Sequence, residues 1–215
     1  MIHVYGVVDE LVELPPVAGL DDAPLERRSV EGVEIVLSRA RSASAEVSRE
    51  AVLRHAQVVE ELMARSGAIL PAQLGRAFRD DDELAAALRE EAPRLVRRLQ
   101  RVRGCAEYGL RAIPTEVAEH EAVASGAEYM RTRLERIRRQ DRLVSELHEP
   151  LARLARENTL HRDAAGEIRA AYLVELADAS SFRDAVARVE ASPELTVVCT
   201  GPWPPYSFAG EKTER

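Results

Sequence analysis

Histidine is the residue type of this chain best suited to proton transfer or metal binding, because neutral imidazole does both near pH 7. The chain has five histidines, at positions His3, His55, His120, His148 and His161. His55 lies on a predicted helix, but Val59 occupies the position one turn later where a second ligand would share its face. Glu119-His120 and His148-Glu149 also lack a second ligand at helical spacing. This spacing favours a hydrogen-bonded structural histidine at position 55.

An acidic run, Asp80-Asp81-Asp82-Glu83, is the second candidate for chemistry, as a calcium-binding loop. An EF-hand loop distributes its oxygens over alternate positions, with glycine sixth and glutamate twelfth, and this run does not fit that spacing. Negative side chains ahead of an apolar periodic segment favour the start of a helix, where they stabilise the positive end of the helix dipole. Arg97, Arg98 and Arg101 complement the far end of that helix.

The chain lacks the sequence motifs of several common enzyme classes. The chain contains no GxSxG, HExxH, GxGxxG or Walker loop, and Cys105 and Cys199 form no CxxC pair. We therefore predict no catalytic residues, no cofactor and no metal site, and a protein that is not an enzyme. A small-molecule enzyme or sensor, with site residues assembled from distant parts of the chain, remains an alternative.

Arginines are concentrated in one predicted helical stretch, at Arg131, Arg133, Arg136, Arg138, Arg139 and Arg142. Successive helical residues differ by about 100 degrees, so these side chains spread around the helix and form no single basic stripe. The net charge of −7 and the pI near 5.4 also disfavour general phosphate binding. We predict no nucleic-acid partner, and a nucleic-acid-binding or regulatory module that uses this helix is kept as an alternative.

Cellular location follows from the apolar runs. No run approaches the roughly 20 residues that cross a bilayer, and the start of the chain lacks a basic region ahead of its apolar segment. We predict a cytoplasmic protein with no membrane contact.

The first part of the chain predicts an α+β domain over residues 1–102. Alternating apolar residues with both faces apolar indicate a central strand over 2–8, and the Glu31-Gly32 turn indicates a hairpin. Ser48 caps a helix that continues to about residue 65. A short strand over 68–74 and the helix after Asp82, which Pro93 should kink or divide, complete this domain.

The second part predicts another α+β domain over residues 103–201. Strands are expected over 105–113, 168–176 and 195–200, with a helix capped by Ser180 or Ser181 before the last strand. A long helical region covers about 115–160, with break points at Gly126 and Pro150. These elements indicate a ferredoxin-like arrangement with extra helix where one strand is missing.

Within the long helical region, apolar residues recur at spacings of three and four. This pattern predicts a packed seam, interrupted by Asp141 and formed by Met130, Leu134, Ile137, Val144, Leu147, Leu151 and Leu154.

The last segment, residues 202–215, is a tail rich in proline and aromatic residues. Pro202, Pro204 and Pro205 favour an extended backbone. Trp203, Tyr206 and Phe208 form the candidate site of the chain, because they offer broad apolar faces. They either anchor the tail on the protein's own surface or form a landing site for a partner.

Several segments together resemble one known family. The chain opens with IHVYGVV, continues through HAQVVEELMARSGAILPAQLGRAF and GCAEY, and ends with TGPWPPYSF. In this order they resemble the gas vesicle protein F/L family. The resemblance implies two α+β domains, the second a modified ferredoxin-like fold. It also implies an accessory protein of gas vesicle formation that binds the hydrophobic shell protein and other gas vesicle accessory proteins, in the cytoplasm and at the gas vesicle.

Overall fold

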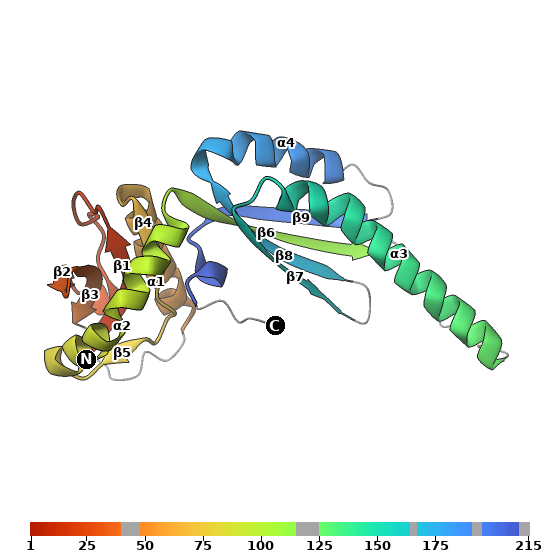
Figure 1. Ribbon diagram of the computed structural model, residues 1–215. Helices are drawn as coiled ribbons and strands as arrows, with labels where there is room; N and C mark the ends of the chain where they lie inside the picture. The colour runs from red at the N-terminus through yellow and green to blue at the C-terminus, as the bar shows by residue number, and fades with distance from the viewer. Residues whose placement is uncertain (40–47, 115–124, 164–166, 191–194, 211–215) are drawn as a thin grey trace. The chain divides into compact units, whose positions relative to one another are not determined.

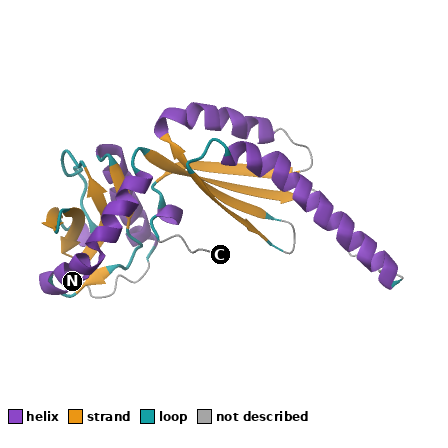
Figure 2. Cartoon of the chain, in the orientation of Figure 1, coloured by secondary structure: helices purple, strands orange, loops and turns teal. Residues whose placement is uncertain are grey.

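The computed structural model describes residues 1–39, 48–114, 125–163, 167–190 and 195–210. These residues form helices and β-sheets (Figures 1 and 2), which confirms the predicted α+β class. The chain divides into two compact units. Unit 1 contains Met1–Ala106 together with Trp203–Arg215, and unit 2 contains Glu107–Pro202. None of the helices in the described ranges is long and apolar enough to cross a membrane.

Unit 1 is built on a sheet with β1 at its centre. The strands are β1 (Ile2–Asp9), β2 (Leu25–Val30), β3 (Val33–Arg39), β4 (Ala68–Pro71) and β5 (Ala77–Phe78). They follow the order β2-β3-β1-β4, and β5 also pairs with β1. Val7 shows the central position of β1, since it lies opposite Ile35 of β3 on one side and Leu70 of β4 on the other. The predicted central strand and the hairpin of β2 and β3 are therefore confirmed.

Two helices complete this unit, and the first has the cap that the sequence predicted. Helix α1 (Arg49–Arg65) begins where the Ser48 hydroxyl accepts a hydrogen bond from the Ala51 amide at 3.1 Å. Helix α2 (Asp81–Val102) begins at the Asp80 cap. Pro93 does not divide α2 as expected. The buried stripe continues in phase on both sides of Pro93, so packing maintains one helix despite the lost backbone hydrogen bond.

Unit 2 contains a four-stranded sheet and two long helices. Its elements are β6 (Cys105–Pro114), α3 (Gly126–Ala152), β7 (Glu157–Arg162), β8 (Ile168–Glu175), α4 (Ala179–Glu190) and β9 (Leu195–Trp203). The strand order is β7-β8-β6-β9. Tyr108 of β6, Tyr172 of β8 and Phe182 of α4 form an aromatic cluster in the core, with ring centroids 4.9 and 5.3 Å from Phe182.

Strand β7 corrects one sequence expectation. The helical region was expected to continue to about residue 160, with one strand of the pattern missing. Instead α3 ends at Ala152, and β7 pairs antiparallel with β8, Asn158 lying opposite Tyr172. Antiparallel pairing with β8, the next strand along the chain, outweighs the helical spacing that ends at Leu154. Gly126 begins α3, Pro150 lies in its last turn, and residues 115–124 of the predicted region lie outside the described residues.

The predicted seam is packed along only part of its length. Leu147 and Leu151 are buried, whereas Met130, Leu134 and Ile137 are exposed. Figure 1 shows that the first half of α3 extends past the strands of its own unit, where the sheet offers nothing to pack against.

Strand β9 also continues farther than expected, through Pro202 to Trp203. It lies at the edge of its sheet, where a proline without an amide hydrogen is tolerated. Gly201 within it has φ +124, and a methyl group there would approach the Glu107 carbonyl oxygen to 2.7 Å. Both its backbone conformation and this close approach require glycine.

Gly201→Ala should therefore lower the free energy of unfolding by about 2 to 5 kcal/mol, since it combines a strained φ with a clash. Gly32→Ala is the matched control. Gly32 also has a positive φ, of 76, but no atom lies within 4 Å of the added methyl, so about 1 to 2 kcal/mol is expected. Chemical unfolding measures both, and equal losses would contradict the steric argument.

Candidate functional site

A buried histidine pair is the first polar cluster that the structure assembles. His3 of β1 and His55 of α1 are both buried, and His3 Nε2 lies 3.0 Å from His55 Nδ1. His55 Nε2 lies 2.9 Å from the carbonyl oxygen of Ala72. A carbonyl only accepts, so His55 Nε2 carries the hydrogen, and His55 Nδ1 accepts from His3 Nε2. His55 is thus a hydrogen-bonded structural histidine, as predicted, but its pairing with His3 was missed.

Both members of this pair are neutral at pH 7. Burial, together with a smaller contribution from the neighbouring His55, lowers the pKa of His3 to about 4. Burial also lowers the pKa of His55. Among the residues described, no group of three or more His, Cys, Asp or Glu side chains is placed to hold a metal ion.

Tyr5, two residues after His3 on β1, belongs to the same cluster, and its ring centroid lies 4.8 Å from that of His3. Its hydroxyl lies 2.9 Å from Ser38 Oγ and accepts a hydrogen bond from the Leu20 amide at 2.7 Å. The Tyr5 ring stacks on His55, with centroids 5.4 Å apart. Because all four side chains of the cluster are buried, they stabilise the fold and cannot contact a substrate without rearrangement.

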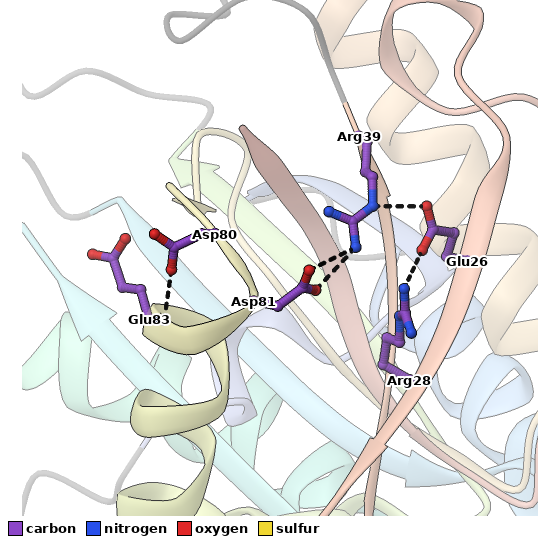
Figure 3. Close-up of polar contacts among 6 residues, drawn as sticks. All are labelled: Glu26, Arg28, Arg39, Asp80, Asp81 and Glu83. Atoms are coloured by element: carbon purple, nitrogen blue, oxygen red, sulfur yellow. Dashed lines mark hydrogen bonds and ion pairs between the residues drawn. The ribbon is translucent and has the colours of Figure 1, made fainter.

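The acidic run at the start of α2 forms structural contacts (Figure 3). Asp80 accepts a hydrogen bond from the Glu83 amide at 2.9 Å. Arg39 of β3 binds both oxygens of Asp81, at 2.9 and 3.0 Å, and also donates to Glu26 of β2 at 3.0 Å. The predicted role of this run as a helix start is confirmed, and its contact with Arg39 fixes α2 against the β2-β3 hairpin.

The aromatic tail is the remaining candidate. Phe208 is 3% exposed, whereas Trp203 is 44% and Tyr206 is 41% exposed. Pro204 and Pro205 are buried, and residues 206–208 form a short 3-10 helix. The three aromatic residues therefore have different environments, since Phe208 is buried and the other two are partly exposed to water.

Arg101 of α2 holds this segment against unit 1. Its guanidinium donates to the carbonyl oxygen of Phe208 and, at 3.2 Å, to that of Gly210. Sequence reasoning assigned Arg101 only to the end of the helix dipole and gave no signal of this contact. We call the half-exposed pair Trp203 and Tyr206 the aromatic tail surface. Burial raises the pKa of Tyr206 to about 12, with a further contribution from Glu60, so its hydroxyl stays protonated.

Among the side chains that the structure describes, the arginine-rich helix α3 shows no convergent basic site. Arg131, Arg133, Arg138 and Arg142 are exposed, and the side chains of Arg136 and Arg139 lie outside the described residues. This agrees with the interpretation of a solvated helix surface.

The fold matches solved structures of gas vesicle proteins. The gas vesicle protein GvpF from Anabaena sp. PCC7120 aligns with a TM-score of 0.83 at 19% identity, over 97% of this chain and 95% of that chain. GvpF from Microcystis aeruginosa aligns with a TM-score of 0.81 at 18% identity, over 97% and 98%. At these identities the likeness shows that the fold is that of gas vesicle F proteins.

Sequence relatives identify the family. Gas vesicle protein L from Streptomyces sp. (strain CB03234) is 32% identical over 220 residues, which are 91% of this chain and 77% of that protein. Gas vesicle protein F1 from Halobacterium salinarum is 24% identical, over 96% and 92%. The family model described as gas vesicle synthesis protein GvpL/GvpF matches residues 1–210. The chain belongs to the GvpL/GvpF family, which confirms the resemblance seen in the sequence.

The histidine pair predicts a pH dependence of stability. Burial lowers the folded pKa of His3 to about 4, so between pH 6.5 and about 4 the unfolded chain binds a proton at His3 that the folded chain does not. The lowered pKa of His55 acts in the same direction. The contribution of His3 to stability is therefore full above pH 6.5 and falls with decreasing pH, by about 1.4 kcal/mol per pH unit within this window. Chemical unfolding from pH 7 to 5 measures this slope.

NMR titration of the same protein is the direct check. The imidazole signals of His3 and His55 should not titrate near pH 6.5, because burial lowers the pKa of both side chains. Titration of the buried pair near pH 6.5 would contradict the neutral arrangement.

Tail anchoring predicts unequal effects of two aromatic substitutions. Phe208→Ala should lower the free energy of unfolding by about 3 to 5 kcal/mol, because it opens a cavity at a buried site. Trp203→Ala should cost less than half as much, because much of its ring is already in water. Urea unfolding of both variants measures the difference, and equal losses would show that Trp203 is part of the core.

Proposed function

We propose that this chain is an accessory protein of gas vesicle formation that binds the hydrophobic shell protein and supports nucleation or assembly of the vesicle wall. It acts in the cytoplasm and at the growing vesicle, together with other gas vesicle accessory proteins, and catalyses no reaction. The observation that carries the proposal is the family match over residues 1–210. The names of the relatives place each of them among gas vesicle proteins.

The physical task of such a protein is to cover apolar surface. A hydrophobic shell protein aggregates in water until its apolar surface is buried in the wall. A folded protein that binds this surface reversibly keeps the shell protein available for assembly. The net charge of −7 supports this task, because like charges keep such complexes apart.

The aromatic tail surface is the proposed contact. Tryptophan and tyrosine are enriched among the side chains that dominate binding energy at interfaces. Trp203 and Tyr206 are presented by a segment that Phe208, two buried prolines and Arg101 already hold in place. Binding therefore costs little additional backbone ordering.

Co-purification tests this contact. The tagged chain is co-expressed with a gas vesicle shell protein, and the shell protein recovered with the tag is quantified. Substituting both residues, Trp203→Ser with Tyr206→Ser, should reduce recovery at least tenfold, since each hot-spot aromatic contributes about 2 kcal/mol or more.

The control is Val12→Ser, which changes an exposed apolar residue of the same unit and should leave recovery unchanged. Equal recovery with the double variant would place the contact on another surface. No recovery with the unsubstituted chain would reject binding of the shell protein.

A further inference from the structure

The first half of α3 carries an exposed apolar stripe. Met130, Leu134 and Ile137 are 53%, 49% and 43% exposed, in a part of the helix that extends past the strands of its unit (Figure 1). We call these three residues the projecting stripe. Farther along α3, Leu143, Leu147 and Leu151 are buried in the unit. The helix therefore has one half that serves the core and another half whose apolar residues face water.

The spacing of the projecting stripe is that of a helix-pairing seam. Positions 130, 134 and 137 are separated by four and three residues, and the same alternation continues through positions 141, 144, 148 and 151. Alternation of three and four places side chains on a strip that another helix can contact along its length. At positions 148 and 151 this strip is covered by the unit itself, since both residues are buried.

Charges beside the stripe select the partner. Arg131 and Arg138 directly follow Met130 and Ile137, and Arg133 directly precedes Leu134, so they flank the stripe on both sides. All three are exposed. In a parallel pair of α3 helices Arg133 would face Arg138 of the second copy, and an antiparallel pair would also bring like charges together. These flanks oppose self-association and complement a partner with acidic flanks.

We propose that the projecting stripe binds an amphipathic helix of another protein, whose apolar seam is flanked by Asp or Glu. The apolar contacts provide affinity, and the arginine flanks set the partner's charge and orientation. The contact is short and covers about two helical turns. Binding is therefore weak and rapidly reversible, with a Kd on the order of 10 μM. It uses a surface of unit 2 and does not depend on the proposed binding of the shell protein.

Two synthetic peptides test the proposal. Each has four heptads with leucine at the seam positions, one with glutamate at both flanking positions and the other with lysine. Fluorescence anisotropy of labelled peptide, titrated with the full chain, should show at least tenfold tighter binding of the glutamate peptide. Added salt should reduce that binding, because the flanking charges are exposed.

Variants separate the apolar stripe from its charges. The triple change Met130→Ser, Leu134→Ser and Ile137→Ser should weaken binding of the glutamate peptide at least tenfold. Leu176→Ser, which alters an exposed leucine elsewhere in the same unit, is the control and should have no effect. Arg131→Glu, Arg133→Glu and Arg138→Glu together should reverse the preference toward the lysine peptide. Circular dichroism should show that every variant retains the helix content of the unsubstituted chain.

Three results would overturn the proposal. The first is equal binding, or no binding, of the two peptides. The second is a concentration-dependent dimer that the triple serine variant abolishes, which would make a second copy the occupant. The third is a gel shift of single-stranded nucleic acid that the charge-reversed variant loses, which would assign the arginines to phosphate binding.

Discussion

Burial of β1 on both of its faces is the constraint on which unit 1 depends. The side chains on both faces of β1 are shielded from water, so each polar side chain on this strand needs a protein partner. His3 and Tyr5 find theirs in His55 of α1, Ser38 of β3 and the Leu20 amide, and His55 in turn reaches Ala72. These contacts fix the helix, the hairpin and the loop before β2 relative to one strand. They also explain why Gly19 is glycine, since a methyl there would lie 2.4 Å from the Tyr5 hydroxyl.

Unit 2 meets the same requirement with a second buried pair. His148 Nδ1 of α3 lies 2.8 Å from the Tyr172 hydroxyl of β8. Burial raises the pKa of Tyr172, so its hydroxyl stays protonated. Burial also lowers the pKa of His148, so the imidazole stays neutral. Histidine, the residue type that suggested chemistry, thus joins a helix to a sheet in each unit.

Two groups of exposed apolar side chains among the described residues form the proposed binding surfaces. The aromatic tail surface belongs to unit 1 and the projecting stripe to unit 2. Each is held by a rigid element, the first by Phe208 and Arg101 and the second by a helix whose other half is packed. Exposed apolar groups on ordered backbone favour binding, because little conformational entropy remains to be lost. This arrangement is consistent with a member of a family of gas vesicle synthesis proteins.

Local patterns in the sequence were sufficient for the α+β class, the β2-β3 hairpin, the Ser48 cap, the acidic start of α2 and the candidate aromatic residues, because each depends on neighbouring residues alone. The family, too, could be recognised from short segments in the correct order. Only the tertiary structure revealed β7, whose strand conformation is imposed by its pairing with β8. It also decided that His3 meets His55, that Arg101 holds the tail, and that Phe208 is buried while Trp203 is half in water. Strand β7 pairs with the next strand along the chain, and the helical spacing that ends at Leu154 concealed it. The contacts of His3 and Arg101 join residues far apart in the chain, and periodicity along the chain carries no information about which distant residues meet.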